Sequence, residues 1–320
     1  MQKTYTEKVK FIESSLGKGN ISRQGDDIAL SCPVCKDGNK KKLSISLNTW
    51  HCHCWVCGYK SRSLVDLLKR FSTRSALDVF RSQFLNEIFL STNNDNIDDE
   101  VFEYPDGYVP LVNFSQNDKN PNIRACFHYL HKRGLSERDL YKYRVGISSQ
   151  LPRRVYFISL DENGCENYFV SRSIDDNIKM KYVNSGTDKT KIVFNDIDID
   201  WDNDLYLVEG VFDAIQLKAN TACLLGSSLA ENSLLFKKIV ANGNNVILAL
   251  DSDVQAKMFK IADKLIKYGC QVKIFPLFEH KDVGSMNHND INQSMNKLET
   301  WDDRMSIMKK ISMIRSSSVF

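Results

Sequence analysis

The pattern of apolar and polar positions along the chain changes near Trp201. Before that residue, the runs Arg154–Leu160 and Tyr168–Arg172 are typical of strands, and the turn residues between them, 161–164, predict a β-hairpin. After it, four short apolar runs alternate with helical stretches, at residues 205–208, 222–225, 246–250 and 272–275. Because strands that alternate with helices imply right-handed βαβ crossovers, the sequence predicts an α/β fold with a mostly parallel sheet.

Other stretches have helical or linker patterns. Residues 63–71 are amphipathic and start at a serine suited to an N-cap, and residues 122–143 have a helical pattern that Gly134 interrupts. Residues 91–106 are acidic and rich in Asn, which is typical of a linker. After Asn296, apolar residues at helical spacing predict a helical tail: Leu298, Trp301, Met305, Met308 and Ile311.

Size and composition indicate a globular protein with more than one core. The chain has 320 residues, of which 42% are hydrophobic and 26% charged, so two or three domains are expected. No uninterrupted apolar run reaches the about 18 residues of a membrane-spanning helix, and residues 1–17 lack the features of a signal peptide. We therefore expect a cytoplasmic protein with no membrane partner.

Charge and cysteine are concentrated in the first quarter of the chain. Residues 1–74 carry a net charge of +8, although the whole chain carries only +3. A basic N-terminal module suggests contact with phosphates, and a merely solvated lysine run at 40–42 is the alternative. Five of the nine cysteines lie between Cys32 and Cys57. Because cytosolic thiols stay reduced, this cluster indicates a metal site.

Two Cys-x-x-Cys pairs lie about twenty residues apart, and they comprise Cys32, Cys35, Cys54 and Cys57. Each pair presents two thiolates at a tight turn, and two pairs complete the tetrahedral shell of one structural Zn²⁺. The strand-like residues between the pairs complete the pattern of a zinc ribbon. We therefore predict these four cysteines as the zinc ligands.

Two questions about this ribbon stay open in the sequence. His51, Cys52 and His53 are further possible ligands, although ordinary strand positions also explain them. Lysines and three aromatic residues, Trp50, Trp55 and Tyr59, surround the site. Such a mixture suits the stacking of bases and the binding of phosphates, and the packing of a small core explains the aromatic residues equally well.

Acidic residues follow three of the predicted strands. Glu209 comes directly after the first strand, Asp251 and Asp253 follow the third, and Asp282 follows the fourth. Asp213 lies one helical turn after Glu209. Because ligands of an open parallel sheet bind at the carboxyl ends of its strands, these carboxylates are expected at one edge. Clustered carboxylates repel each other, and they suit Mg²⁺ that acts in phosphoryl transfer.

Here the chain resembles a known family. Residues 205–215 and 246–253 are similar to the two signature stretches of the Toprim fold. With the zinc ribbon upstream, the chain resembles the bacterial-type (DnaG-like) DNA primases, in the compact form of tailed bacteriophages. Further similarity to family motifs lies at residues 143–146, 154–160, 171–174, 181–185 and 225–229. The resemblance covers roughly residues 30 to 285.

The resemblance implies an organisation and a set of site residues. The implied segments are a template-binding zinc ribbon at 1–75, a linker at 76–106, a basic N-terminal subdomain of the primase core at 107–200, a Toprim subdomain at 201–285 and a helical tail at 286–320. Glu209, Asp251, Asp253 and Asp282 would hold one to three catalytic Mg²⁺, supported by Asp213. Template or nucleotide would be bound by Arg172, Lys181, Lys142, Arg144 and Arg154.

The chain also departs from the family pattern. Gly284 stands where the family often carries a second acid, so the number of metals stays open. Bacterial members usually have one His among their zinc ligands, whereas this ribbon offers four cysteines. Their C-terminal helicase-binding domain is expected to be absent here, or reduced to residues 286–320.

The implied activity is that of a primase, a nucleotidyltransferase and DNA-directed RNA polymerase that makes short RNA primers on single-stranded DNA. The implied partners are ribonucleoside triphosphates and a ring-shaped, hexameric replicative helicase within a primosome, in the host cytoplasm if the protein serves a phage. Another Toprim enzyme such as a nuclease, or a non-enzymatic zinc protein that binds DNA, is the alternative. If residues 91–106 are flexible, the ribbon and the core are expected to move as separate bodies.

Overall fold

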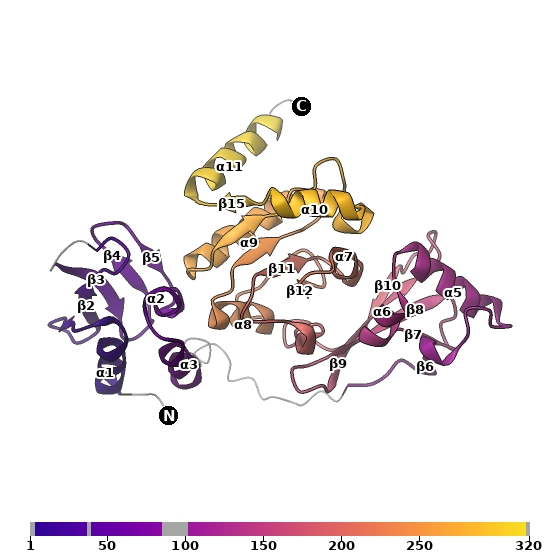
Figure 1. Ribbon diagram of the computed structural model, residues 1–320, viewed down its shortest axis with the longest axis horizontal. Coiled ribbons are helices and arrows are strands. Elements are labelled where there is room, and N and C mark those ends of the chain that lie inside the picture. Colours follow the sequence, from indigo (N-terminus) through magenta and orange to yellow (C-terminus); the bar gives the residue numbers. More distant parts are fainter. Residues whose placement is uncertain (1–3, 37–39, 85–101, 318–320) are drawn as a thin grey trace.

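The computed structural model describes residues 4–36, 40–84 and 102–317. In these residues the strands form three five-stranded sheets, which follow one another along the chain. Figure 1 shows the first sheet at one end of the molecule, the second at the other end and the third between them. The predicted α/β fold is confirmed, since the third sheet is mostly parallel and a four-cysteine cluster lies in the first.

The first sheet is antiparallel and has the order β1-β2-β3-β4-β5. Its strands are β1 (Asn20–Ile21), β2 (Asp27–Ser31), β3 (Lys41–Ser46), β4 (Cys52–Cys54) and β5 (Lys60–Ser61). Alternating residues such as Leu43 and Ile45 are buried on one face. Three helices complete this unit: α1 (Tyr5–Leu16), α2 (Val65–Phe71) and α3 (Arg74–Gln83). We call residues 4–84 the ribbon unit.

Helix α3 belongs to the core of the ribbon unit. Leu77 and Phe80 of this helix are buried with Phe84 against Trp50 and Phe11. The division at residue 75 and the linker at 76–106 stay predictions, and the packing of α3 favours a first unit that extends to Phe84. Most of the acidic stretch 91–106 lies outside the described residues.

The second sheet is antiparallel and has the order β10-β9-β8-β7-β6. Its strands are β6 (Tyr108–Pro110), β7 (Gly146–Ser148), β8 (Arg154–Leu160), β9 (Glu166–Ser173) and β10 (Tyr182–Asn184). The predicted hairpin is confirmed as β8 and β9. The predicted helical stretch is confirmed as α5 (Pro121–Lys132) and α6 (Glu137–Lys142), which separate at Gly134, where φ is +79°.

The third sheet has the order β12-β11-β13-β14-β15, with strands β11 (Leu205–Val208), β12 (Thr221–Cys223), β13 (Val246–Leu248), β14 (Val272–Ile274) and β15 (Glu299–Trp301). The first three pairs in this order are parallel, and β15 is antiparallel to β14. Helices α7 (Val211–Leu217), α8 (Leu234–Asn242) and α9 (Gln255–Lys267) connect its parallel strands. Strand β13 is buried throughout, as its continuous apolar run predicted.

The helical prediction for the tail was wrong at its start. Residues Glu299–Trp301 form edge strand β15, and helix α11 (Asp303–Ser317) begins only after it. Trp301 is buried in the strand because its ring stacks on Phe259 of α9, with centroids 4.7 Å apart. Helix α10 (His288–Asn296) precedes the strand.

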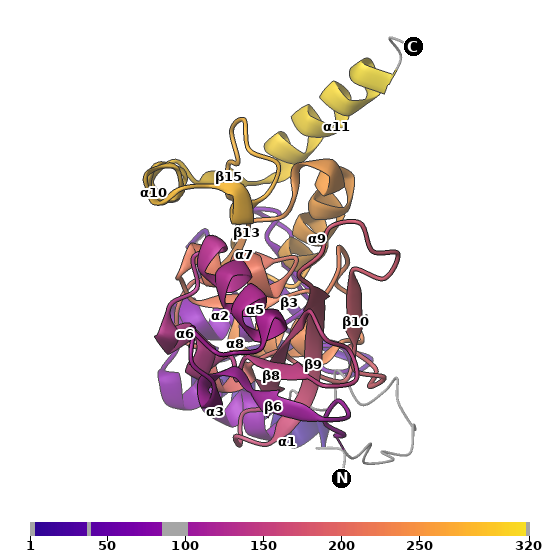
Figure 2. The ribbon, with the colours of Figure 1, turned by 90° about the vertical axis from the view of Figure 1, so that its right-hand side faces the viewer.

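Helix α11 extends away from the body of the molecule in both ribbon views (Figures 1 and 2). Its residues Ile307, Met308 and Ile311 are exposed. Among the described residues, no helix has both the length and the apolar character that a bilayer crossing requires.

Candidate active site and metal centres

Three acidic residues meet at the carboxyl edge of the parallel sheet. Glu209 directly follows β11, whereas Asp251 and Asp253 follow β13, its neighbour in the sheet. One carboxylate oxygen from each lies within 4.8 Å of the others. The backbone N–H of Asp251 donates to Oε1 of Glu209 at 3.2 Å, which fixes one carboxylate against the next strand. The predicted meeting of these three residues is therefore observed.

Asp213 and Asp282 lie beside this group. Asp213 is in the first turn of α7, and its carboxylate accepts hydrogen bonds from the backbone N–H groups of Gly210 (3.2 Å) and Gly284 (3.1 Å). It thereby ties α7 to the turn that begins at Asp282. A Cβ at Gly284 would lie 3.2 Å from Oδ1 of Asp213 and 3.4 Å from Oδ1 of Asp282. Glycine at this position thus leaves room for two carboxylates, where a larger side chain would crowd them.

The electrostatics of the group favour a bound cation or proton. Burial, followed by the charge of Glu209, raises the pKa of Asp251 to about 7. Burial, followed by the charge of Asp282, raises the pKa of Asp213 to about 6. Burial also raises the pKa of Glu209, although the backbone N–H of Asp251 opposes it. Since oxygen donors that repel one another are the ligand set that Mg²⁺ prefers, these carboxylates fit a magnesium site.

A pocket of about 400 Å³ opens beside the carboxylates. Glu209 and Asp251 line it from the carboxyl edge of the parallel sheet and Asp213 lines it from α7, whereas Tyr182 and Asn184 line it from β10 of the second sheet. We call it the acidic pocket. The sequence had assigned no role to Tyr182 or Asn184, although their place in the motif-like stretch 181–185 was the available signal.

The five predicted basic residues differ in their burial and in their hydrogen-bond partners. Arg172 is nearly buried, and its Nε donates to the hydroxyl of Tyr129 at 2.9 Å while Nη1 donates to the hydroxyl of Tyr182. Arg172 therefore reaches the acidic pocket through Tyr182. Lys181 is half-exposed and lies 3.6 Å from Asp176.

None of the five predicted basic residues is among those that line the acidic pocket. Arg154 is buried, and its guanidinium donates to the backbone carbonyls of Lys181 (3.1 Å) and Met180 (2.6 Å). It holds the loop between β9 and β10, a structural position. Lys142 lies 3.9 Å from Asp198, and Arg144 donates to the carbonyl of Lys142. Both lie at or just after the C-terminal end of α6.

The four predicted zinc ligands meet in the ribbon unit. The sulfur atoms of Cys32, Cys35, Cys54 and Cys57 lie within 4.8 Å of one another, and the individual separations include 3.9 Å for Cys32–Cys57 and 4.0 Å for Cys35–Cys54. Burial opposes ionisation of Cys54, but backbone N–H groups of Cys57 and Val56 outweigh it and lower its pKa to about 7. Four such sulfurs fit a structural Zn²⁺. Cys52 is buried apart from them, with its Sγ 3.4 Å from the carbonyl of Trp50.

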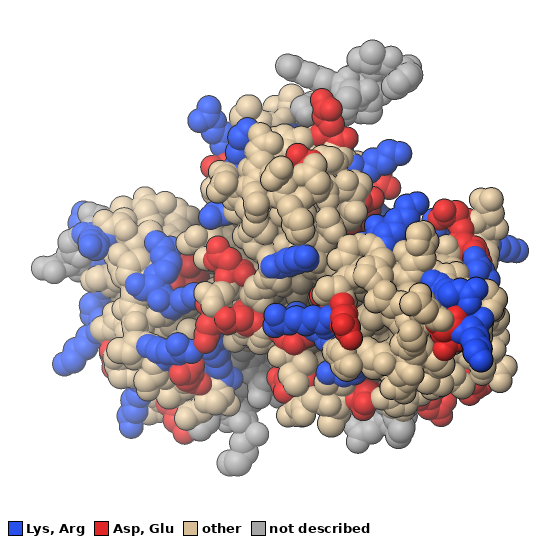
Figure 3. Space-filling model, turned by 45° about the vertical axis from the view of Figure 1, so that its right-hand side comes forward, with Lys and Arg blue, Asp and Glu red and all other residues tan. Residues whose placement is uncertain are grey.

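The aromatic residues of the ribbon unit have different environments. Trp50 is fully buried, and Tyr59 donates its hydroxyl hydrogen to Asp66 at 2.8 Å. Trp55, in the turn between Cys54 and Cys57, is 72% exposed, with its ring centroid 4.1 Å from that of His53. Of these three, Trp50 is fully buried, Tyr59 is half-buried and Trp55 is exposed. Figure 3 shows Lys and Arg side chains predominating over the ribbon unit at the left of the molecule.

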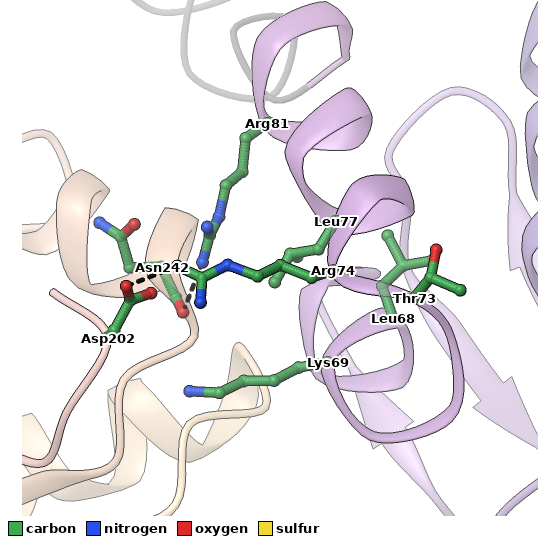
Figure 4. Close-up of a pocket in the computed structure, with 8 residues that line it drawn as sticks. All are labelled: Leu68, Lys69, Thr73, Arg74, Leu77, Arg81, Asp202 and Asn242. Atoms are coloured by element: carbon green, nitrogen blue, oxygen red, sulfur yellow. Dashed lines mark hydrogen bonds and ion pairs between the residues drawn. The ribbon is translucent and has the colours of Figure 1, made fainter.

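A second pocket, of about 230 Å³, lies between the ribbon unit and the third sheet (Figure 4). Arg74 reaches across it to Asp202 at 2.6 Å, and Arg81 donates to the carbonyls of Ala241 and Asn242. Asp202 precedes β11 and Asn242 precedes β13, so this pocket lies at the amino ends of the parallel strands. It is therefore at the opposite edge from the carboxylates and is an interface between units.

Comparisons with known proteins find similarity in solved structures. No protein-family model matches the sequence, and no curated protein matches it significantly. The zinc-binding and RNA polymerase domains of the Aquifex aeolicus primase share 17% identity, with a TM-score of 0.49 over 94% of this chain and 87% of that chain. A DnaG primase catalytic domain bound to single-stranded DNA shares 19% identity, with a TM-score of 0.47 over 59% of this chain and 76% of that chain.

A further similar structure contains bacteriophage T7 lagging-strand DNA polymerase with primase domains of two gp4 subunits bound to an RNA/DNA hybrid and dTTP. The matched chain shares 21% identity, with a TM-score of 0.41 over 53% of this chain and 91% of that chain. At such identities the likeness does not extend to substrate or activity. Those depend on the side chains of the site.

Proposed function

We propose that this protein is a DNA primase that joins ribonucleoside triphosphates into short RNA primers on single-stranded DNA. The observation that carries the proposal is the meeting of Glu209, Asp251 and Asp253 at the carboxyl edge of a parallel sheet, beside the acidic pocket. The same chain holds a four-cysteine unit with an exposed tryptophan. Templated nucleotide joining requires both a site for metal-bound phosphates and a surface that holds the template.

Each group in the acidic pocket has a role in this proposal. Glu209, Asp251 and Asp253 would hold Mg²⁺, with Asp282 beside them. When bound, Mg²⁺ offsets the negative charge of the phosphates during in-line transfer. Asp213 is a positioning residue, since it accepts hydrogen bonds from two separate loops. Tyr182 borders the pocket, and Arg172 fixes its hydroxyl.

The ribbon unit would hold the template. Cys32, Cys35, Cys54 and Cys57 would bind one Zn²⁺, which supplies folding energy to a sheet of short strands. The exposed ring of Trp55 suits stacking on an unpaired base, and nearby lysines suit the phosphates. Lys181, Lys142 and Arg144 would contribute further contacts to the template or nucleotide.

The finer biological setting of the proposal follows from the resemblance described above. We propose a role in phage DNA replication, within the cytoplasm of the host cell, together with a ring-shaped replicative helicase. Co-sedimentation of the purified protein with such a helicase tests the partnership. Sedimentation of the two proteins as separate species would count against it.

The test of the activity uses the four ribonucleoside triphosphates, Mg²⁺ and a mixed-sequence single-stranded DNA. We expect short RNA products and release of pyrophosphate, and we expect both to disappear in Asp251→Asn. Asp204→Asn is the matched control, because Asp204 is exposed at the opposite edge of the same sheet. Shortening of labelled DNA without RNA synthesis would favour a nuclease, and DNA binding with neither reaction would favour a non-enzymatic protein.

A further inference from the structure

Two lysines flank a loop that borders the acidic pocket. The loop, residues 225–228, follows β12, and its Leu225 and Gly226 line the pocket. The backbone N–H of Gly226 donates to the carbonyl of Glu209 at 3.3 Å, which ties the loop to the strand end that carries a predicted metal ligand. The loop therefore forms one side of the pocket at a fixed distance from the carboxylates.

Both lysine side chains contact this loop, and they come from different parts of the chain. Lys189 lies in the segment after β10, and its Nζ donates to the carbonyl of Leu225 at 3.0 Å. Lys257 lies in the first turn of α9, and its Nζ donates to Oγ of Ser227 at 2.7 Å. Both residues are exposed. An ammonium group carries three N–H donors, so each can bind the loop and a phosphate oxygen together.

Gly226 allows the close approach of Lys189. A Cβ at this position would lie 3.0 Å from Nζ of Lys189, and the φ of Gly226 is +144°. The two ammonium groups thus lie along the side of the pocket formed by the loop.

We propose that Lys189 and Lys257 hold the β- and γ-phosphates of an incoming nucleoside triphosphate on the loop side of the acidic pocket. This inference rests on the proposed function and adds the subsite for the polyphosphate. In the reaction, a 3′-hydroxyl oxygen bonds to the α-phosphorus, its proton passes to solvent, and the bond to the β-phosphate oxygen breaks. Pyrophosphate leaves with the electron pair and remains bound by the same lysines until it is released.

Charge explains why the subsite is needed. The carboxylates of the pocket repel a triphosphate, and Mg²⁺ shared among them offsets only part of that repulsion. Arg172, which reaches the pocket through Tyr182, is engaged with two tyrosine hydroxyls. Lys189 contacts Leu225 of the pocket lining, and Lys257 contacts Ser227, which follows Gly226 of the lining. Charge-assisted hydrogen bonds from ammonium to phosphate are among the stronger polar contacts in proteins.

The test measures binding of magnesium pyrophosphate and magnesium ATP to the full-length protein by titration calorimetry. We expect Lys189→Ala and Lys257→Ala each to raise the dissociation constant about tenfold, since each removes a hydrogen bond to a charged group. In primer synthesis the KM for nucleotide is expected to rise by a similar factor. Lys189→Arg and Lys257→Arg should restore most of the affinity.

Lys260→Ala is the matched control, because Lys260 is an exposed lysine one turn further along α9. It should leave both dissociation constants unchanged. Affinity for single-stranded DNA without nucleotide, measured by fluorescence anisotropy, should be equal in all variants. If DNA affinity falls and pyrophosphate affinity does not, the lysines bind the template and the inference is wrong.

The inference and the proposed function can fail separately. Unchanged pyrophosphate binding in both alanine variants, or no binding by the wild-type protein, would overturn the inference even if primers are made. Lysine-dependent pyrophosphate binding without primer synthesis would support the subsite and reject the primase activity. If Lys260→Ala loses as much pyrophosphate affinity as Lys189→Ala and Lys257→Ala, the effect is one of general charge and the inference is also rejected.

Discussion

The ionised carboxylates at the sheet edge destabilise the metal-free protein, because they are partly buried and repel one another. The pKa of Asp251 is raised to about 7 from an ordinary value near 3.8, first by burial and then by Glu209. The folded state therefore binds a proton more tightly than the unfolded state. Stability is highest below about pH 4 for this group and falls as pH rises towards 7.

We therefore predict that Asp251→Asn stabilises the protein in magnesium-free buffer at pH 8, by about 2–4 °C in Tm for each kcal/mol of relieved repulsion. The gain should shrink as the pH is lowered to 5, because protonation then relieves the same repulsion in the wild type. Circular dichroism melting at three pH values, without a chelator that would remove zinc, measures the effect. If Asp204→Asn raises Tm by the same amount, the stabilisation does not come from relieved repulsion within the carboxylate cluster.

Two tryptophans that the sequence grouped together differ in their surroundings. Trp50 is fully buried, with its ring centroid 5.0 Å from that of Phe80, and its Nε1 has no hydrogen-bond partner among the described residues. Trp55 is 72% exposed. Burial therefore assigns Trp50 to the core and leaves Trp55 available to a base.

We predict that Trp55→Ala weakens single-stranded DNA binding by about 1–3 kcal/mol without lowering Tm, because an exposed ring stacks on bases and supports no core. Trp55→Phe should keep part of the affinity. Trp50→Ala should instead destabilise the ribbon unit by about 3–5 kcal/mol. Anisotropy and thermal melting separate the two effects, and full DNA affinity in Trp55→Ala would remove Trp55 from the template surface.

At the scale of secondary-structure elements, the first sheet consists of strands of two to six residues. Such short strands gain little from one another, so a metal shared by the loops between them is expected to supply much of the folding energy. We predict one Zn²⁺ per chain. Cys57→Ser should lose it and make the ribbon unit sensitive to limited proteolysis.

Cys52→Ser is the control for this prediction, since Cys52 is buried apart from the four-sulfur cluster. It should keep full zinc content, as measured by elemental analysis. If Cys52→Ser loses zinc and Cys57→Ser retains it, Cys52 and not Cys57 is the zinc ligand.

Elements with a strong local pattern were predictable from the sequence, and those decided by distant contacts were not. The continuous apolar runs at β11, β13 and β14 predicted a parallel sheet, and the acids after them followed from its geometry. Trp301 has helical spacing with its neighbours, yet it lies in a strand because its ring stacks on Phe259 and its Nε1 donates to Asp263. Arg154 lies in a stretch similar to a family motif and was expected to bind template or nucleotide, but its guanidinium donates to backbone carbonyls.

At the scale of the whole molecule, polar contacts join the ribbon unit to the third sheet. Helices α8 and α9 end at the ribbon unit. There Arg81 donates to the last two carbonyls of α8, Lys69 donates to the carbonyl of the following Gly243, and the backbone N–H of Arg62 donates to the carbonyl of Lys267. Cations at helix C-termini interact favourably with the helix dipole. In this structure the ribbon unit is therefore docked on the third sheet through charged and polar contacts. Independent movement of the two bodies stays a prediction.

We predict that Lys69→Ala combined with Arg81→Ala releases the ribbon unit. The two side chains contribute three hydrogen bonds from cations to carbonyls, and each such bond is typically worth about 1.5–3 kcal/mol. Small-angle scattering should show a larger radius of gyration in the variant than in the wild type. In the wild type, added salt should produce a similar increase, because screening weakens the same contacts.

Arg70→Ala is the matched control, since Arg70 pairs with Asp66 inside the ribbon unit and makes no such bond to α8. If docking orients the template, the released variant should lose preference among templates that differ only at the start site, while it keeps nucleotide joining. Primer synthesis on such templates, for the variant and the control at several salt concentrations, measures that preference. An unchanged radius of gyration in the double variant would show that the remaining contacts, the Arg74–Asp202 ion pair and the packing of Ala241 against the ribbon core, suffice to hold the units together.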